Sequence, residues 1–462
     1  MNTRSYNAEI AFSSDWDVIV VGGGPAGCTA SAAAAREGAK VLLLERTGAL
    51  GGMGTQGLVP SWCPLSDGKR MIYRGLALEV FENSLVLPAS PDGLVNGIEP
   101  DSEKMYEQLF MPFNIPGVRD GIPIDCERLK RAYDNLIESF GVEVLFHSFV
   151  CDVEKKSDTE LDAIIVANKR GLTAYQAKFF VDATGDGDIA AWSGADFEVG
   201  AENTRDIQPA TFCFQLANVD SFYYRTLWRN CTYGWHPMSV NKDLVEDPEF
   251  PNIRDNHLCN NFQGPGVIGY NAGHLHADPL SPESLSRCMI AGRKLAYDFR
   301  TALAKHSPET FSSSLLVKTA ELPGIRESRR IRGDYILTWR DYAERRTFED
   351  EIGRNCYCID IHGSNPEVEK IKEQCCYEKG ESHGIPYRSL VPEKLDNLLV
   401  AGRCISVDRI VHGSTRIMPT CLVTGEAAGS AAALAVHSGR NAHNINVAEL
   451  RKNLKQHGAF FN

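Results

Sequence analysis

Apolar residues open the chain with a short run that ends in glycines. Residues 17–21 (DVIVV) are almost continuous Val and Ile, which is typical of a buried parallel strand. Gly22, Gly24 and Gly27 follow at the spacing GxGxxG, and the stretch 26–36 is mostly alanine. This pattern predicts a strand, a tight turn and a helix whose N-terminus can hold a pyrophosphate.

A second apolar run, residues 41–44, ends at Glu45, where a carboxylate can accept hydrogen bonds from a ribose. Pro25 suits the first turn of the intervening helix, where its missing N–H is no loss. A glycine-rich turn alone is compatible with an ordinary α/β protein. Strand, turn, helix, strand and terminal acid in this order favour nucleotide binding, and they leave NAD and FAD both open.

Up to residue 205, the spacing of apolar residues predicts a series of helices and strands. Apolar residues at helical spacing predict a helix over 125–140, and the following segment, 141–154, indicates a pair of strands. Residues 161–182 alternate like a hairpin with its turn at 169–171. Residues 65–120, with a helical patch near 75–81, resemble an insertion rich in Pro and Gly.

The pattern changes after residue 205. Residues 206–384 carry more aromatics and scattered charge and no second GxGxxG, whereas 385–462 returns to a buried strand and a helix of small residues over 420–437. We therefore predict an α/β fold: a discontinuous, three-layer, Rossmann-like nucleotide-binding domain (1–205 and 385–462) with an inserted α+β cap or substrate domain (206–384).

Composition narrows the function classes. The net charge of −12 argues against a nucleic-acid partner or an anionic membrane surface. The chain has no uncharged apolar run of membrane-spanning length, and residues 1–16 read as a polar tail without a signal-peptide core. The 14 cysteines lack framework spacing, which is typical of a reducing compartment. We expect a cytoplasmic protein.

A second cluster of glycines and acids follows the last strand of the hairpin. In VDATGDGDIA, residues 181–190, Ala183, Thr184 and Gly185 lie where the backbone must approach a neighbour closely. Asp186 and Asp188 would repel a phosphate, so a role at ribityl hydroxyls, through a water or as a helix N-cap is the better interpretation. By itself the cluster indicates only a turn before a helix.

A third cluster spans residues 398–433. A strand leads to Gly402, an irregular loop follows, and Pro419 opens a helix at about Thr420. The N-terminus of that helix carries partial positive charge and, if it were aimed at a flavin, would stabilise the anionic reduced ring. The loop carries five charged or titratable side chains: Arg403, Asp408, Arg409, His412 and Arg416. They suit the binding of an anionic substrate or proton transfer. Alternatively, they are solvated surface charges that pair with one another or with Glu426.

Together the three clusters carry a resemblance. The order VVGGGPAG, LLLER, GG, VDATGDGD, LLVAGRCISVDRIVHGSTRIMPT and TGEAAG is similar to FAD-dependent oxidoreductases related to the fumarate reductase and succinate dehydrogenase flavoproteins, which have the glutathione-reductase type of FAD-binding fold. The resemblance covers nearly the whole chain and implies FAD as the cofactor. Residues expected to hold FAD are Gly22, Gly24, Pro25, Ala26, Gly27, Glu45, Arg46, Gly51, Gly52, Val150, Ala183, Thr184, Gly185, Asp186, Gly402, Arg403, Met418 and Thr420.

The same resemblance suggests catalytic residues. His412, Gly413 and Arg416 match an HG…R stretch whose arginine grips a substrate carboxylate in the fumarate reductase relatives. Arg416 is thus the first candidate for substrate binding, with His412 and Arg403 orienting substrate or handling protons. His276 is a further candidate from the cap. The loop after the arginine is shorter than in those enzymes and their other dicarboxylate ligands have no match, so dicarboxylate specificity is not implied.

Two other groups of residues do not predict a functional site. A set of Cys and His residues lacks the usual spacing of structural zinc ligands, so we predict no metal site: Cys356, Cys358, Cys375, Cys376, His362 and His383. A run of arginines interleaved with acids favours an ion-paired face at the domain junction over a binding patch: Arg326, Arg329, Arg330 and Arg332.

The predicted function is that of an FAD-dependent oxidoreductase exchanging a hydride between flavin N5 and a small, anionic organic substrate. Its electron donor or acceptor, whether oxygen, a quinone, NAD(P)H or another protein, is left open, as is homo-oligomerisation. Two alternatives remain. One is a redox-inactive flavin-fold protein like the escort proteins of small GTPases, and the other is a flavoprotein of RNA modification.

Overall fold

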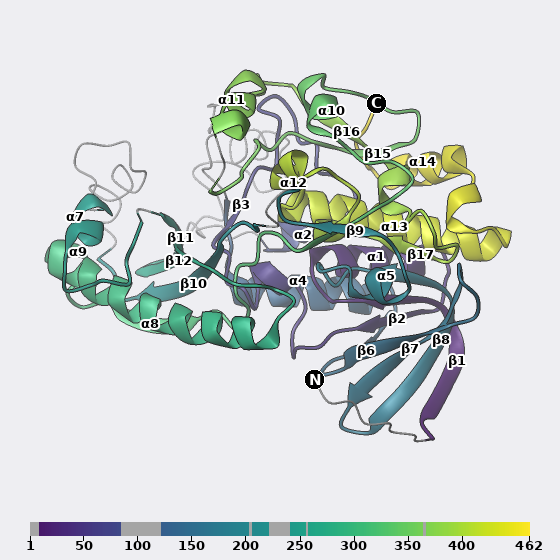
Figure 1. The fold of residues 1–462 in the computed structure, drawn as a ribbon, viewed down its shortest axis with the longest axis horizontal. Helices are drawn as coiled ribbons and strands as arrows, with labels where there is room; N and C mark the ends of the chain where they lie inside the picture. Colours follow the sequence, from purple (N-terminus) through teal and green to yellow (C-terminus); the bar gives the residue numbers. More distant parts are fainter. Residues whose placement is uncertain (1–8, 85–121, 203–205, 221–240, 256, 364–365) are drawn as a thin grey trace, which may run out of the picture.

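A parallel sheet forms the centre of the larger unit. Its strands lie in the order β5 (Glu143–Leu145), β2 (Val41–Leu44), β1 (Ala11–Val21), β8 (Gly171–Asp182) and β17 (Leu398–Val400), all parallel (Figure 1). The computed structural model describes residues 9–84, 122–202, 206–220, 241–255, 257–363 and 366–462. The apolar runs read from the sequence are buried here on both faces, as parallel strands require.

An antiparallel meander continues from β8. Strand β7 (Leu161–Asn168) pairs with β8, which confirms the predicted hairpin, and β6 (Phe149–Lys155) pairs with the other edge of β7. Strand β1 begins at Ala11, where its first residues pair with β8. The prediction of a polar tail through residue 16 was therefore wrong at its end, because the long strand β8 offers a partner to polar residues as well.

Two helices of small residues pack closely against each other beside the sheet. They are α1 (Pro25–Arg36) and α13 (Met418–Ser438), which lie far apart in the sequence and side by side in the molecule (Figure 1). A Cβ at Gly425 or Gly429 would collide with the backbone of α1. These glycines let the two helices approach closely and join the two ends of the chain in one domain.

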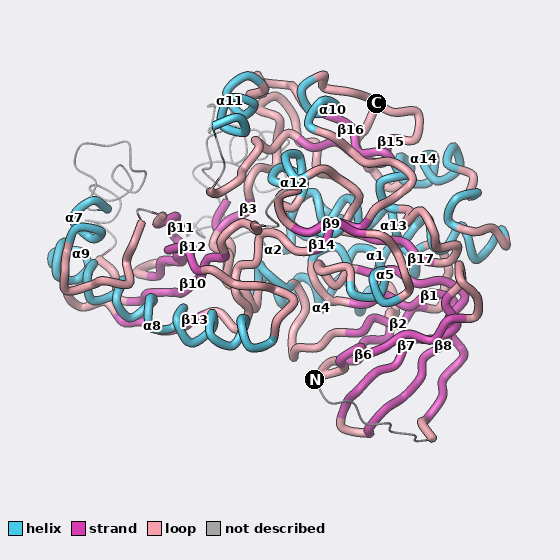
Figure 2. Tube along the Cα trace, in the orientation of Figure 1, coloured by secondary structure: helices cyan, strands magenta, loops and turns pink. Residues whose placement is uncertain are grey.

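The smaller unit is a second sheet with its own core. Its order is β11 (Leu258–Gly264), β12 (Val267–Leu275), β10 (Ala210–Ala217) and β13 (Leu315–Thr319), and the long helix α8 (Pro282–His306) packs against it (Figure 2). Phe214 stacks on Tyr270 and Phe299 inside this core. The inserted cap is thus α+β, as predicted.

The two cores divide the chain differently from the predicted boundary at 384. Side chains between Ile331 and Tyr377 join the core of the larger unit, while the second core draws on residues from Phe212 to Ala320. Leu58 and Cys126, from the first part of the chain, pack into the second core. The cap therefore rests on the larger unit through shared apolar contacts.

Further short elements complete the described chain. They are β3 (Ser61–Trp62), α2 (Leu76–Ser84), β4 (Ile122–Pro123), α4 (Cys126–Ser139), α5 (Asp188–Trp192), β9 (Phe197–Val199), α7 (Asn241–Glu246), α9 (Pro308–Phe311), β14 (Arg329–Ile331), α10 (Trp339–Ala343), β15 (Glu351–Asn355), α11 (Pro366–Gln374), β16 (His383–Pro386), α12 (Arg409–Thr415) and α14 (Val447–Gln456). Asp125 caps α4, which confirms the predicted helix over 125–140. Most of the predicted insertion 65–120 lies outside the described residues, although α2 matches its helical patch.

Within the described ranges, no individual helix has the length and apolar composition needed to cross a membrane. Helices α12 and α13 reach that composition only when taken together, and they meet at an angle of 93°.

Candidate functional site

A cavity of about 710 Å³ opens at the carboxyl ends of the parallel strands. Val21, Leu44 and Ala401 line it where β1, β2 and β17 end, and residues of the cap close the other side. Ligands of doubly wound sheets bind at this edge, because the loops that follow parallel strands gather there.

Most of the predicted cofactor contacts surround this one cavity. Those that line it are Gly22, Gly24, Pro25, Ala26, Glu45, Arg46, Gly52, Val150, Ala183, Thr184, Gly185, Asp186, Gly402, Arg403 and Met418. Gly27, Gly51 and Thr420 belong to the same elements but do not line it. Segments predicted separately from three parts of the sequence therefore meet at one site.

The first glycine turn is shaped as a cradle. Gly22 has φ +99°, and a Cβ there would press on the carbonyl of Ala183, while a Cβ at Gly27 would collide with the Gly22 carbonyl. At Gly24, the N-cap of α1, a Cβ would meet nothing within 4 Å. The turn is thus packed on the protein side and open on the cavity side, which fits a pyrophosphate at the helix N-terminus.

Glu45 is held in position at the end of β2. Its carboxylate accepts hydrogen bonds from the backbone N–H of Gly23 and of Thr47, each at 2.7 Å. The side chain therefore links the second strand to the glycine turn and lines the cavity beside it. This is the place at which the sequence predicted an acceptor for a ribose hydroxyl.

The acids of the second cluster differ in environment. Asp182 is fully buried and accepts hydrogen bonds from Thr184 and from the Ala190 N–H. Burial raises the pKa of Asp182 to about 6. Burial also opposes ionisation of Asp186, but Arg403, 2.7 Å away, and other partners hold the pKa of Asp186 below its ordinary value.

Asp182 predicts a pH dependence of stability. Its folded pKa of about 6 lies above the ordinary 3.8, so the native state binds more protons than the unfolded chain between these values. Stability contributed by the protonated form is present below pH ~4 and is lost as the pH rises through ~6. In urea unfolding, wild type should lose about 2 kcal/mol relative to Asp182→Asn between pH 4 and 7. A difference that is constant with pH would contradict the raised pKa.

The third cluster contains more helix than predicted. Residues 409–415 form α12, capped by the Asp408 side chain, which accepts from the Val411 N–H at 2.8 Å. The prediction of an irregular loop was wrong here because this cap and burial stabilise a short helix that periodicity could not reveal. Helix α13 begins at Met418, and Ile417, Met418 and Pro419 place its N-terminus on the cavity wall.

Arg416 lines the cavity, with 12% of its side chain exposed. Its Nη2 donates to the backbone oxygen of Asp360 at 2.8 Å and lies 3.2 Å from the Asp360 carboxylate. Its Nε is buried and has no acceptor among the described residues. Arg416 thus brings a positive charge to the cavity wall, where an anionic ligand could pair with it.

The other catalytic candidates are placed differently. Arg403 lines the cavity and pairs with Asp186. His412 is fully buried and donates from Nε2 to the Arg403 carbonyl at 2.9 Å, and burial lowers its pKa well below the usual range. His276 is exposed, and neither histidine lines the cavity. The catalytic roles of all three residues remain predictions, and neither histidine contacts the cavity.

Sequence reasoning missed several polar residues that line the cavity. They are Thr211, His257, Asn260, Asn271, Arg326, Tyr357, Asp360 and His362. Arg326 was predicted to belong to an ion-paired face, yet its guanidinium donates to the Pro209 carbonyl at 2.7 Å, and burial lowers its pKa to about 10. Ion pairing is confirmed for Arg329 with Asp188 and for Arg330 with Glu327.

The family follows from a comparison with known proteins. Residues 17–454 match the family described as FAD dependent oxidoreductase, so the chain belongs to this family. The protein is an FAD-dependent enzyme, and the open cradle at Gly24 fits its cofactor. The narrower relation to fumarate reductase flavoproteins rests on the motifs alone. No curated protein sequence matches the chain.

Solved structures of low sequence identity match most of the length of this chain. A geranylgeranyl bacteriochlorophyll reductase-like protein from Thermoplasma acidophilum is 13% identical with a TM-score of 0.46, and the match covers 96% of this chain and 83% of that one. A flavoprotein/dehydrogenase from Cytophaga hutchinsonii is 13% identical (TM-score 0.43; 96% and 82% covered). An anhydrotetracycline hydroxylase from Streptomyces rimosus is 12% identical with a TM-score of 0.43, and the match covers 95% of this chain and 65% of that one.

Proposed function

We propose that this enzyme exchanges a hydride between flavin N5 and a small, anionic organic substrate. The observation that carries the proposal is the Arg416 guanidinium, whose residue lines the cavity with 12% of its side chain exposed. An anion bound in the cavity can pair with this partly desolvated charge, and such an ion pair is stronger there than in water.

Arg326 supports the same interpretation. Its guanidinium lines the cavity and is close enough to Arg416 for the two positive charges to interact. Two arginines in a largely buried wall attract a carboxylate or a similar anion. Asp360 offsets part of this charge, because its carboxylate pairs with Arg416.

FAD, when bound, supplies the acceptor or donor of an electron pair. The chain's own residues supply position and charge. The N-terminus of α13 presents partial positive charge to the cavity, which would stabilise negative charge placed against it. His412 donates to the Arg403 carbonyl, and the Arg403 side chain pairs with Asp186, so hydrogen bonds fix the position of Arg403 at the cavity.

An anaerobic substrate screen tests the proposal. The purified protein, containing FAD, is mixed with small carboxylic, hydroxy and amino acids, and the loss of the oxidised flavin absorbance is followed. We expect reduction by one class of acids and none by the matching neutral amides. Equal reduction by acids and amides would contradict the anionic substrate.

The same preparation separates the two alternatives. A colourless protein that takes up no FAD would fit the escort-type protein and contradict the oxidoreductase. Tight RNA binding at physiological salt, with no response to any acid, would favour the role in RNA modification.

A further inference from the structure

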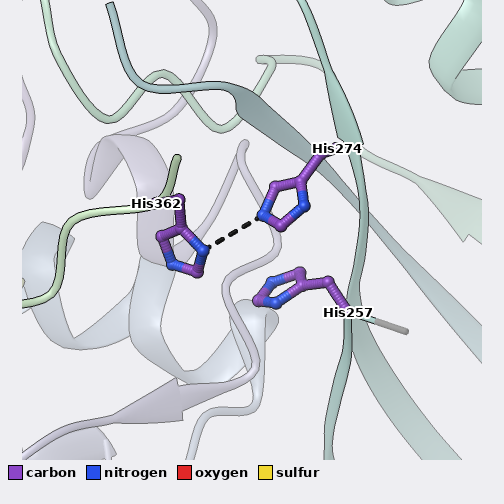
Figure 3. Close-up of side chains that lie close together, drawn as sticks. All are labelled: His257, His274 and His362. Atoms are coloured by element: carbon purple, nitrogen blue, oxygen red, sulfur yellow. Dashed lines mark hydrogen bonds between the residues drawn. The ribbon is translucent and has the colours of Figure 1, made fainter. Parts of the chain in front are cut away.

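Three histidines gather on the cap side of the cavity. His257 lies just before β11, His274 lies in β12, and His362 follows β15 (Figure 3). One ring nitrogen from each lies within 4.8 Å of the others, and they are the only such group of potential metal ligands among the described residues. His257 and His362 also line the cavity.

The His274 and His362 rings each place one nitrogen against a carboxylate and the other nitrogen against each other. His274 Nδ1 lies 3.2 Å from the Asp255 carboxylate, and His362 Nε2 lies 3.3 Å from the Asp360 carboxylate. A neutral imidazole carries one N–H, so donation to these acids leaves His274 Nε2 and His362 Nδ1 unprotonated. Those two nitrogens are 3.1 Å apart (Figure 3), a contact that either a shared proton or a metal ion ligated by both nitrogens can bridge.

The spacing suits a metal ion. Ligand nitrogens about 2.0–2.1 Å from a tetrahedral zinc ion lie about 3.3 Å from each other. The centroids of the three rings are 4.6, 4.9 and 5.2 Å apart, and one nitrogen of His257 lies within 4.8 Å of a nitrogen of each of the other two rings. Imidazole nitrogen is a preferred ligand of Zn²⁺ and of its neighbours in the first transition series.

The surroundings provide a supporting layer of acids. Asp255 accepts from the backbone N–H groups of His257 and His274 as well as facing the His274 ring. A carboxylate behind a histidine fixes the ring's tautomer and makes its free nitrogen a better ligand. Arg326 opposes a cation, since its Nη2 lies 3.3 Å from His257 Nε2. His257 would have to exchange this arginine for the ion.

We propose that His257, His274 and His362 bind one divalent transition-metal ion, with Zn²⁺ as the best match to their chemistry. Three histidines leave a fourth position of a tetrahedral ion open. Because two of the rings line the cavity, that position is accessible to a ligand inside it. The metal site does not require the proposed hydride transfer, although Arg326 and Asp360 contact both the histidines and the proposed anion site. Of the three histidines, only His362 was weighed as a metal ligand from the sequence.

Zinc binding by the untagged, FAD-containing protein tests this site. After treatment with a chelator, the protein is titrated with Zn²⁺ against a chromogenic competitor. We expect one ion per chain, with affinity lowered at least ~100-fold in His274→Gln and in His362→Gln. Asp255→Asn should lower affinity about 10- to 100-fold by removing the support behind His274.

His443→Gln is the matched control. His443 also pairs with a carboxylate, Asp334 at 2.7 Å, but lies outside the cluster, so its variant should bind zinc like wild type. Flavin content and thermal unfolding check that each variant folds. Should a histidine variant fail to fold, Co²⁺ added to wild type decides the matter, because a tetrahedral site gives strong visible bands.

Each outcome bears on one proposal. Absence of stoichiometric zinc and of cobalt bands in wild type, or equal affinity in wild type and in folded cluster variants, would overturn the metal site. Flavin reduction is measured separately on the same samples. A protein that is reduced by acids but binds no zinc contradicts only the metal site, and one that binds zinc but resists reduction contradicts only the proposed function.

Discussion

Arg416→Ala is expected to lower kcat/KM for flavin reduction by about 100-fold or more with any acid found in the screen. Removing one partner of a buried charge pair costs about 2–5 kcal/mol, and each 1.4 kcal/mol is tenfold. Arg416 lines the cavity and offers its positive charge to an anion bound there. Stopped-flow reduction under anaerobic conditions measures the effect.

Three controls make the result specific. Arg440→Ala removes an exposed arginine that bonds only to the nearby Asn444 carbonyl, so its reduction rate should equal that of wild type. Arg416→Lys keeps the charge but loses the planar fork, and it should retain part of the rate. FAD content should be unchanged in all of them. Full activity in Arg416→Ala would remove this residue from substrate binding.

Gly24→Ala is expected to weaken FAD binding about 10- to 100-fold without unfolding the protein. A Cβ at Gly24 meets no protein atom within 4 Å, so the apoprotein tolerates it. The methyl group would instead occupy the space at the α1 N-terminus that a pyrophosphate needs, and overpacking of that size costs about 1–3 kcal/mol. Fluorescence titration of the apoprotein with FAD gives the dissociation constant.

Gly264→Ala is the matched comparison for this change. A Cβ at Gly264 also meets nothing within 4 Å, but this glycine, at the end of β11, does not line the cavity. Its FAD affinity should stay at the wild-type value. If both alanine variants bind FAD like wild type, the pyrophosphate does not lie against Gly24.

Several segments that line the cavity were visible in local patterns. The glycine turn and Glu45 were identified from a few neighbouring residues, whereas the turn around Thr184 was assigned to the cofactor only through the resemblance. This worked because a turn that brings backbone close to a ligand restricts the residues that form it. The apolar runs of the parallel strands were visible for a similar reason, since burial on both faces excludes polar side chains.

Residues brought together from distant elements were predicted less well. Arg326 was assigned to an ion-paired face because acids are its neighbours in sequence, yet the fold turns it into the cavity. His362 was considered only with nearby cysteines, and His257 carried no signal at all. Their partners are set by the packing of the cap sheet on the larger unit, which no short segment records.

The sequence by itself determined the α/β class and the place of the glycine turn, because these depend on local backbone geometry and on burial along one strand. FAD followed only from the order of three motifs along the whole chain, which the family shares. Only the tertiary structure decided that Arg326 and Arg416 share a cavity and that His257, His274 and His362 lie in one cluster. Side chains converge in space through the packing of whole elements. That packing is settled by the sum of many contacts across the molecule, so it leaves no motif at any one position.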